Sequence, residues 1–487
     1  MSNISEQQPQ GSASWMHRLV THYREARRNS PNDTLAIVFD IDGTIIDTRY
    51  LILHTLLGYD RTHGTMLFRS LPVERITVHE AEIEPLLRQL DVPRHRREPI
   101  IDYYMQNLWS DEAVLAAHQP YRGVMEVIRW FQMQPQTVVA LNTGRPESVR
   151  QSTLRALNKL GHEYRVNFES ELLFMNQGEW GEAVADTKVV ALAQLRERGV
   201  RVVAAIDNEP ENLEAMAHAD TAHEGLFLHA STIFLSARRP LLRSCSGSVY
   251  DLAPFVAEAE LQGHVQLVLS EVTRARTLAY CVDSPVHWLA VPVRADRYGR
   301  PEIAFADDAA HLRPEITLHD VLDLAADAGR SVRIDFQSGG AVIDQVLAIV
   351  SACDVSDPSL WFSGALHDLS EHGVQRLRAN HPTSTISCPA DFLAPLVFGA
   401  LEHSLELIDV LRGWGIDRFS LNWRQARVRE LIGQLERWGA AVDVTGIQET
   451  ESMLQAALLL PRSVTVNVDA LIPAIRSSSR RATERPR

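Results

Sequence analysis

Two aspartates separated by one residue, Asp40 and Asp42, carry the clearest chemical signal in this sequence. They follow the apolar run 35–39, whose branched and aromatic residues predict a buried strand. Two carboxylates at the end of such a strand repel each other unless a cation lies between them. Gly43 directly follows Asp42 and permits a sharp turn of the backbone. The pattern therefore predicts a nucleophile and an acid/base beside Mg²⁺, in preference to a solvated Asp-Gly turn.

Further polar groups follow apolar segments downstream. The segment 142–145 reads Asn-Thr-Gly-Arg after a predicted strand, and its hydroxyl and backbone amides can hold a phosphoryl oxygen. Lys188 opens a helical pattern, and Asp207 ends the apolar run 202–206. Singly, these residues are explained as a turn, a solvated lysine and a helix cap. Their order at the ends of predicted elements is better explained by one shared site.

These segments resemble, in order, the four motifs of the haloacid dehalogenase-like (HAD) phosphohydrolases, the first of which reads DxDGT. The resemblance implies that Asp40 attacks phosphorus and forms an aspartyl-phosphate, while Asp42 acts as acid and then as base. It implies that Thr143 and Lys188 bind and neutralise the phosphoryl group. The implied cofactor is Mg²⁺, bound by the carboxylates of Asp40 and Asp207 and by the backbone carbonyl of Asp42.

The same resemblance supplies a wider set of expected contacts. Residues expected to bind the substrate are Gly43, Thr44, Asn142, Gly144 and Arg145. The fourth motif departs slightly from the family pattern, with Asp-Asn at 207–208, and either Glu211 or Asn212 could assist the metal ligand. The ion-pumping members carry Thr at the second aspartate and the dehalogenases lack that acid, so Asp42 favours hydrolysis of phosphate esters.

Length and composition limit the class of protein. A chain of 487 residues with 45% hydrophobic residues is expected to form two or more globular domains. The formal net charge of −14 argues against general nucleic-acid binding. No apolar run approaches the roughly 20 residues needed to span a bilayer, and the polar first residues do not resemble a secretory signal. We expect a cytoplasmic protein with reduced thiols at Cys245, Cys281, Cys353 and Cys388.

The first half of the chain reads as a doubly wound α/β domain. Its strands are predicted near 35–39, 137–141, 171–174, 201–206 and 226–229. A mostly helical insert over about 48–134, with helices predicted at 80–90 and 98–108, is by the resemblance a cap over the active site. Whether a cap residue such as Arg69 contacts the substrate is left open.

The second half reads as a (β/α)₈ barrel, with another doubly wound domain as the alternative. Apolar segments alternate with helical patterns near 265–269, 288–293, 332–336, 360–363, 384–387, 418–421, 441–444 and 464–467. The predicted organisation is a polar tail and helix over 1–32, the HAD-like domain over 33–243, a connector over 244–263, the barrel over 264–472 and a disordered basic tail over 473–487.

The segment 318–338, a predicted helix and strand, resembles the menorin-like branch of the glycerophosphodiester phosphodiesterase barrels. That branch carries a catalytic His, a Glu-x-Asp metal pair and a lysine, where this chain has Ser270, Ala290, Pro292 and Gln337. Asp335 alone remains, and one carboxylate cannot build a metal site. We therefore expect a non-catalytic barrel that serves binding or assembly. The alternative is a site rebuilt from His287, Asp307 and Asp308.

The sequence thus predicts a Mg²⁺-dependent phosphate-monoester hydrolase with a phosphorylated small molecule as substrate. One alternative is a polynucleotide or nucleotide phosphatase, because the stretch 142–160, with Arg145, Arg150 and Thr153, loosely resembles the phosphatase half of polynucleotide kinases. A phosphate-binding GxxxxGK[ST] loop for the kinase half is not present in the sequence. Another alternative is a ligand-sensing or scaffold protein, and a homo-oligomer remains possible.

Overall fold

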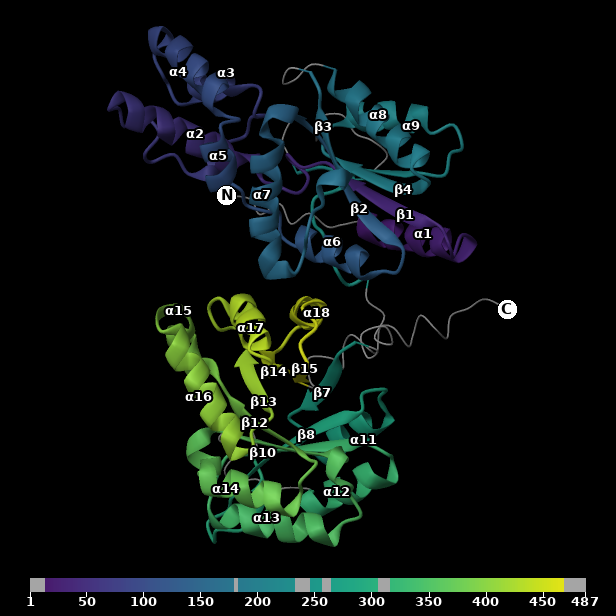
Figure 1. The fold of residues 1–487 in the computed structure, drawn as a ribbon, viewed down its shortest axis with the longest axis vertical. Coiled ribbons are helices and arrows are strands. Elements are labelled where there is room, and N and C mark those ends of the chain that lie inside the picture. The colour runs from purple at the N-terminus through teal and green to yellow at the C-terminus, as the bar shows by residue number, and fades with distance from the viewer. Residues whose placement is uncertain (1–13, 179–182, 233–245, 256–263, 305–315, 468–487) are drawn as a thin grey trace, which may run out of the picture. The chain divides into compact units, whose positions relative to one another are not determined.

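The chain divides into two compact units after Phe255 (Figure 1). The computed structural model describes residues 14–178, 183–232, 246–255, 264–304 and 316–467. The predicted basic tail over 473–487 and the candidate residues Asp307 and Asp308 lie outside this part of the chain. Each unit is described separately below.

The first unit contains a six-stranded parallel sheet with the strand order β3-β2-β1-β4-β5-β6. Its strands are β1 (Thr34–Phe39), β2 (Thr137–Pro146), β3 (Leu173–Asn176), β4 (Val200–Asp207), β5 (Leu226–Ala230) and β6 (Ser246–Gly247). Its helices are α1 (Trp15–Asn29), α2 (Thr48–His63), α3 (Ile83–Gln89), α4 (Arg94–Asn107), α5 (Asp111–Ala116), α6 (Val124–Met133), α7 (Arg150–Gly161), α8 (Val184–Glu197) and α9 (Pro210–Ala219). This architecture confirms the predicted doubly wound sheet.

Strand β1 is apolar, and helices cover both faces of the sheet around it. Ala36 and Val38 pack against α8 and α9, while α1 and α6 contact β4 and β2 (Figure 1). A strand covered in this way needs a continuous run of apolar residues, which is the pattern that the sequence shows. The polar groups that follow such strands are therefore placed together at the carboxyl edge of the sheet.

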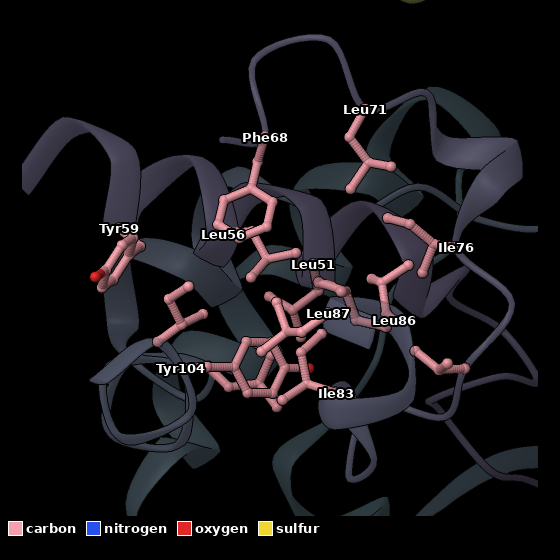
Figure 2. Close-up of a cluster of buried hydrophobic side chains, with 14 of the residues drawn as sticks. Leu51, Leu56, Tyr59, Phe68, Leu71, Ile76, Ile83, Leu86, Leu87 and Tyr104 are labelled. Atoms are coloured by element: carbon pink, nitrogen blue, oxygen red, sulfur yellow. The ribbon is translucent and has the colours of Figure 1, made fainter. Parts of the chain in front are cut away.

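The cap is a separate helical layer built on its own apolar cluster (Figure 2). Helices α2, α3, α4 and α5 contribute to it, and its buried members run along the chain from Leu51 to Ala117. Helix α6 packs on β2 instead, so the helical cluster ends before the expected limit of the insert at residue 134. The cap therefore connects to the sheet on either side of this cluster, through the segments that follow β1 and precede α6.

Two helices of the cap differ from their predicted bounds. The sequence predicts a helix over 80–90, but α3 begins at Ile83, and α4 begins at Arg94 rather than near 98. A turn in which Glu82 N donates to His79 O (2.9 Å) precedes α3. Ile83, Leu86 and Leu87 then enter the cap cluster. Packing of these apolar residues sets the start of α3, and Glu80 is left in a loop.

The second unit is a closed barrel of eight parallel strands, which confirms the preferred prediction over a second doubly wound domain. Its strands are β7 (Gln266–Ser270), β8 (Trp288–Ala295), β10 (Ser331–Phe336), β11 (Leu360–Gly364), β12 (Thr385–Pro389), β13 (Arg418–Asn422), β14 (Ala441–Ile447) and β15 (Ser463–Asn467), with β9 (Pro301–Ile303) antiparallel to β8. Its helices are α11 (Ala275–Asp283), α12 (Leu318–Asp327), α13 (Ala341–Ala352), α14 (Leu366–Asn380), α15 (Ala394–Gly399), α16 (Leu401–Trp414), α17 (Val428–Arg437) and α18 (Thr450–Leu458).

A buried polar network fills part of the barrel. Trp361 is the largest fully buried side chain among the described residues, and the guanidinium carbons of Arg333 and Arg418 lie 4.8 and 4.3 Å from its ring centroid. Arg333 Nη1 pairs with Asp443 Oδ2 at 3.1 Å, and Ser463 Oγ donates to Asp443 Oδ1 at 2.7 Å. The buried charge of Asp443 is thus paired with that of Arg333, as burial of a charge requires.

Replacing Asp443 by alanine is expected to destabilise the barrel by about 3 kcal/mol or more, because Arg333 and Ser463 would both lose their buried carboxylate partner. The check is the hydrogen-exchange free energy of the β14 amides in the full chain. Asp409 has a side chain that is 63% exposed, so Asp409→Ala is a suitable control, expected within about 0.5 kcal/mol of wild type. Equal effects of the two substitutions would show that the network contributes no net stability.

Two smaller expectations concern membranes and thiols. In the part of the chain that the structure describes, every helix is too short or too polar to cross a bilayer. Cys281, Cys353 and Cys388 are free thiols, and Cys245 lies outside the described residues.

Candidate active site

Three strand ends bring the predicted motifs together. Phe39 pairs with Leu141 of β2 and with Ile206 of β4, so the next residues along the strands, Asp40, Asn142 and Asp207, are neighbours at the carboxyl edge of the sheet. The amide of Asp40 donates to the carbonyl of Ile206 at 2.9 Å, which continues the ladder to the site. The register of three parallel strands therefore assembles residues that are distant in sequence.

Lys188 joins the two carboxylates. From the beginning of α8, its Nζ lies 2.5 Å from Asp40 Oδ1 and 2.7 Å from Asp207 Oδ2, and it also donates to the carbonyl of Asn142 at 2.7 Å. Its side chain is 2% exposed. Burial alone would lower the pKa of Lys188, but the charges of Asp207 and Asp40 outweigh it and raise that pKa. Lys188 is therefore favoured as a cation beside these carboxylates, and its role toward a phosphoryl group stays a prediction.

Asp40 is a buried carboxyl group among other charged side chains. Burial raises the pKa of Asp40 to about 8, with Lys188 opposing and the charges of Asp207 and Asp42 adding to the rise. Asp40 Oδ2 is buried and has no hydrogen-bond partner among the described residues. Crowded carboxylates with one oxygen unpartnered are the donor set that a divalent cation with oxygen ligands fits.

The fourth motif is also ordered around Asp207. Its Oδ1 accepts hydrogen bonds from the amide of Glu209 at 2.8 Å and from Asn212 Nδ2 at 3.2 Å. Of the two residues that the sequence left open, Asn212 contacts Asp207, while Glu211 lines the adjacent cavity. Asn212 therefore orients the expected metal ligand.

Asp42 is held by a buried arginine. Arg145 Nε and Nη2 each lie 2.7 Å from one carboxylate oxygen of Asp42, and the Arg145 side chain is completely buried. The same guanidinium bonds Thr153 Oγ1 at 3.1 Å and His118 Nε2 at 3.0 Å. Burial, together with the charge of Arg145, lowers the pKa of His118 well below its usual range, so the ring is neutral beside the guanidinium. Arg145, expected to bind substrate, thus orients Asp42 in this state of the site.

The remaining predicted site residues lie in different parts of the site. Thr143 is buried and its Oγ1 accepts from the amide of Arg145 at 3.2 Å. Asn142 Nδ2 donates to the carbonyl of Lys188 at 3.0 Å. Gly43 has a φ of 77°, which a residue with a side chain rarely adopts, and Thr44 is fully buried. Of the five residues expected to bind substrate, Gly144 and Arg145 line the cavity; the roles of all five stay predictions.

A cavity of about 620 Å³ connects these groups to the cap. From the sheet side it is lined by Asp40, Asp42, Gly144, Arg145, Val184, Lys188, Asn208, Glu209, Glu211 and Asn212, and from the cap side by His79, Glu80, Ala81, Glu82, Met105 and Trp109. Arg69 is exposed and does not line this cavity.

His79 and Glu80 are absent from the site that the sequence predicts. The polar run His79-Glu80-Ala81-Glu82 offered a signal, but the expected helix over 80–90 hid it. In the structure, His79 Nε2 lies 3.5 Å from both Glu80 Oε1 and Glu209 Oε1. Because Glu209 follows β4, this histidine links the cap to the sheet.

Raising the pH is expected to loosen this link. Burial alone would lower the pKa of His79, but the bond to Glu209 and the charge of Glu80 raise it to about 9, above its ordinary value of 6.5. The stabilisation of the fold by protonated His79 is complete below about pH 6.5 and is lost as the pH rises through 9. We expect lower hydrogen-exchange protection factors around residues 76–83 at pH 10 than at pH 7.

The matched control for this experiment is His63, which is exposed on the same cap and stacks on Tyr59. His79→Gln should remove the pH dependence of protection, whereas His63→Gln should retain it. An unchanged pH dependence in His79→Gln would assign the effect to another group.

The barrel places its candidate residues differently. Asp335 lies beside Pro292 in the strand register, and its Oδ1 is 2.8 Å from Arg333 Nε. His287 precedes β8 and contacts Ser331 Oγ at 2.9 Å, at the amino end of strands whose carboxyl ends hold Asp335. The alternative site built from His287, Asp307 and Asp308 stays a prediction, because Asp307 and Asp308 lie outside the described residues.

Comparisons with known proteins give low similarity. No family model and no curated protein matches the sequence. A phosphodiesterase from Oleispira antarctica in complex with the product sn-glycerol-3-phosphate is similar at 13% identity, over 44% of this chain and 98% of that chain, with a TM-score of 0.34. A HAD-superfamily hydrolase of subfamily IA from Geobacter sulfurreducens is similar at 13% identity, over 45% and 95% of the two chains, with a TM-score of 0.30. A putative phosphoglycolate phosphatase from Lactobacillus plantarum is similar at 12% identity, over 43% of this chain and 93% of that chain, with a TM-score of 0.27. At such low similarity, no activity transfers to this chain.

Proposed function

We propose that this chain is a Mg²⁺-dependent phosphate-monoester hydrolase that acts through a phosphorylated Asp40. The observation that carries the proposal is the arrangement of Asp40, Lys188 and Asp207, with Asp40 Oδ2 unpartnered among the described residues at a cavity of about 620 Å³. A cavity of this size accommodates a small organic phosphate. Nucleophile, permanent cation and acid/base all lie on its wall.

In the first step, a carboxylate oxygen of Asp40 attacks phosphorus, the phosphorus–oxygen ester bond breaks and the alcohol leaves. Asp42 gives the leaving oxygen its proton. A protonated oxygen of Asp42 is a weaker acceptor than a carboxylate oxygen, so one of the two bonds from Arg145 that the structure shows weakens when Asp42 carries this proton.

In the second step, Asp42 takes a proton from water as the water attacks phosphorus, and phosphate and free Asp40 are released. The bidentate contact with Arg145 fits this step, because it fixes the direction of an ionised Asp42. Lys188 offsets the negative charge of Asp40 and of the phosphoryl group throughout.

The residues that would hold Mg²⁺ are the carboxylates of Asp40 and Asp207 and the backbone carbonyl of Asp42. When bound, the ion supplies positive charge that stabilises the transferring phosphoryl group. The unpartnered oxygen of Asp40 supports this assignment. So does the raised pKa of Asp40, which is caused mainly by burial and increased further by the charges of Asp207 and Asp42.

The test is hydrolysis of an aryl phosphate by the purified full chain. Phosphate release should require Mg²⁺, disappear with EDTA and return when Mg²⁺ is restored. Beryllofluoride, which imitates an aspartyl-phosphate, should raise the melting temperature only when Mg²⁺ is present. Hydrolysis without any response to beryllofluoride would point to direct attack by water instead.

A nucleotide or polynucleotide substrate has weaker support. Arg150 bonds Glu147 and the carbonyls of Ser170 and Leu173, and Arg145 is paired with Asp42, so neither of these two arginines offers a free anion site. Faster release of phosphate from a 3′-phosphorylated oligonucleotide than from every small ester would favour this alternative.

For the barrel, we propose a role in binding or assembly without catalysis. Asp335 is paired with Arg333, and its neighbour across β8 is Pro292 rather than a carboxylate. The full chain carrying Asp40→Asn should release no alcohol from a glycerophosphodiester with Mg²⁺, Ca²⁺ or Mn²⁺. Diesterase activity that is lost on adding Asp335→Ala would establish a second catalytic centre.

A further inference from the structure

Glu80 lines the cavity and carries a buried acceptor oxygen. The residue is 6% exposed, its Oε2 has no hydrogen-bond partner among the described residues, and it lines the same cavity as Asp40. Its position is built by the cap: Tyr104, which is fully buried, donates its hydroxyl to the carbonyl of Glu80 at 2.8 Å. A buried carboxylate oxygen without a donor is costly, so a donor from a ligand would be strongly favoured there.

The charges around Glu80 favour a cationic ligand group. The described lining includes four glutamates, Glu80, Glu82, Glu209 and Glu211. Its arginine and its lysine are already paired, Arg145 with Asp42 and Lys188 with Asp40 and Asp207. His79 is shared between Glu80 and Glu209, at 3.5 Å from each. A second anionic group on the substrate would meet net negative charge, whereas an ammonium would offset it.

We propose that Glu80 binds a protonated amine on the alcohol part of the ester, so that the substrates are phosphate monoesters of amino alcohols. This inference rests on the proposed function, since it places the phosphoryl group at Asp40 and the amine at Glu80. Burial raises the pKa of Glu80 and outweighs the opposing charge of His79, and the charge of Asp42 adds to the rise. An ammonium group supplies three donors and a full charge.

The first experiment compares three small esters of similar size on the full chain with Mg²⁺. These are 2-aminoethyl phosphate, propyl phosphate and phosphoglycolate, which end in an ammonium, a methyl group and a carboxylate. A charge-assisted hydrogen bond to a buried carboxylate should make kcat/KM for the amine at least about tenfold higher than for propyl phosphate. Phosphoglycolate should be the slowest of the three.

The second experiment assigns the preference to a residue. Glu80→Gln keeps the shape of the side chain and removes its charge. The kcat/KM for the amine ester, divided by that for propyl phosphate, should therefore fall to a value between about 1 and 3. The control is Glu84→Gln, on the same cap segment, because Glu84 pairs with Arg88 and does not line the cavity. Its ratio should equal that of wild type.

Binding separates this inference from the proposed function. The full chain carrying Asp40→Asn should bind 2-aminoethyl phosphate at least about tenfold more tightly than propyl phosphate in calorimetry with Mg²⁺. Selective binding without turnover in wild type would overturn the hydrolase and keep the amine site. Turnover of all three esters without preference would overturn the amine site and keep the hydrolase.

One further outcome would also overturn the inference. If Glu80→Gln slowed all three esters equally and raised the Mg²⁺ concentration needed for activity, Glu80 would serve the metal rather than the amine. If Glu80→Gln fails to fold, the wild-type ratio of kcat/KM for 2-aminoethyl phosphate to that for propyl phosphate decides whether the amine is preferred.

Discussion

Replacing Asp40 by asparagine is expected to abolish release of phosphate from an aryl phosphate, with a loss on the order of 10⁴-fold or more. Asparagine keeps the size of the side chain but cannot act as the attacking carboxylate. The substitution removes a buried carboxyl group that lies close to the charges of Asp207 and Asp42, so the fold should persist. The measurements are single-turnover phosphate release and a thermal melt of the same sample.

The control for this substitution is Asp33→Asn. Asp33 directly precedes β1, at the opposite end of the strand from Asp40, and its side chain is 52% exposed. This variant should turn over like wild type. Wild-type turnover in Asp40→Asn would exclude the covalent route, and the hydrolase would then need another nucleophile.

The second large effect is expected for Lys188→Met, which should lose activity by about 10²–10³-fold. It should also destabilise the first unit by about 3–5 kcal/mol, because Asp40 and Asp207 would face each other in a buried site without their cation. Mg²⁺ should recover part of this stability by taking the place of the ammonium charge. The Mg²⁺-dependent rise in melting temperature should therefore be larger in the variant than in wild type.

The chain supplies its own control for this experiment. Lys159, its one other lysine, is exposed on α7. Lys159→Met should change neither activity nor the response to Mg²⁺, and its stability should stay within about 0.5 kcal/mol of wild type. An equal response to Mg²⁺ in wild type and Lys188→Met would show that the ion does not bind among these carboxylates.

The sequence determined the frame of the site. Runs such as 35–39 and 202–206 are apolar because both faces of their strands are covered, so their ends could be located from local pattern alone. Parallel strands of one sheet end at one edge, and this places Asp40, Asn142 and Asp207 together without further information. The eight strands of the barrel were predictable for the same reason, since each is a short apolar run between helices.

Only the tertiary structure decided which partner each polar side chain takes. The 103 residues that separate Arg145 from Asp42 leave no local signal that the guanidinium binds the acid/base. Glu80 reaches the cavity because packing of Ile83, Leu86 and Leu87 in the cap starts α3 late and leaves residue 80 in a loop. In the barrel, Arg333 meets Asp443 across 110 residues. Strand ends follow from local hydrophobic pattern, whereas ion pairs depend on distances that exist only after distant segments have packed.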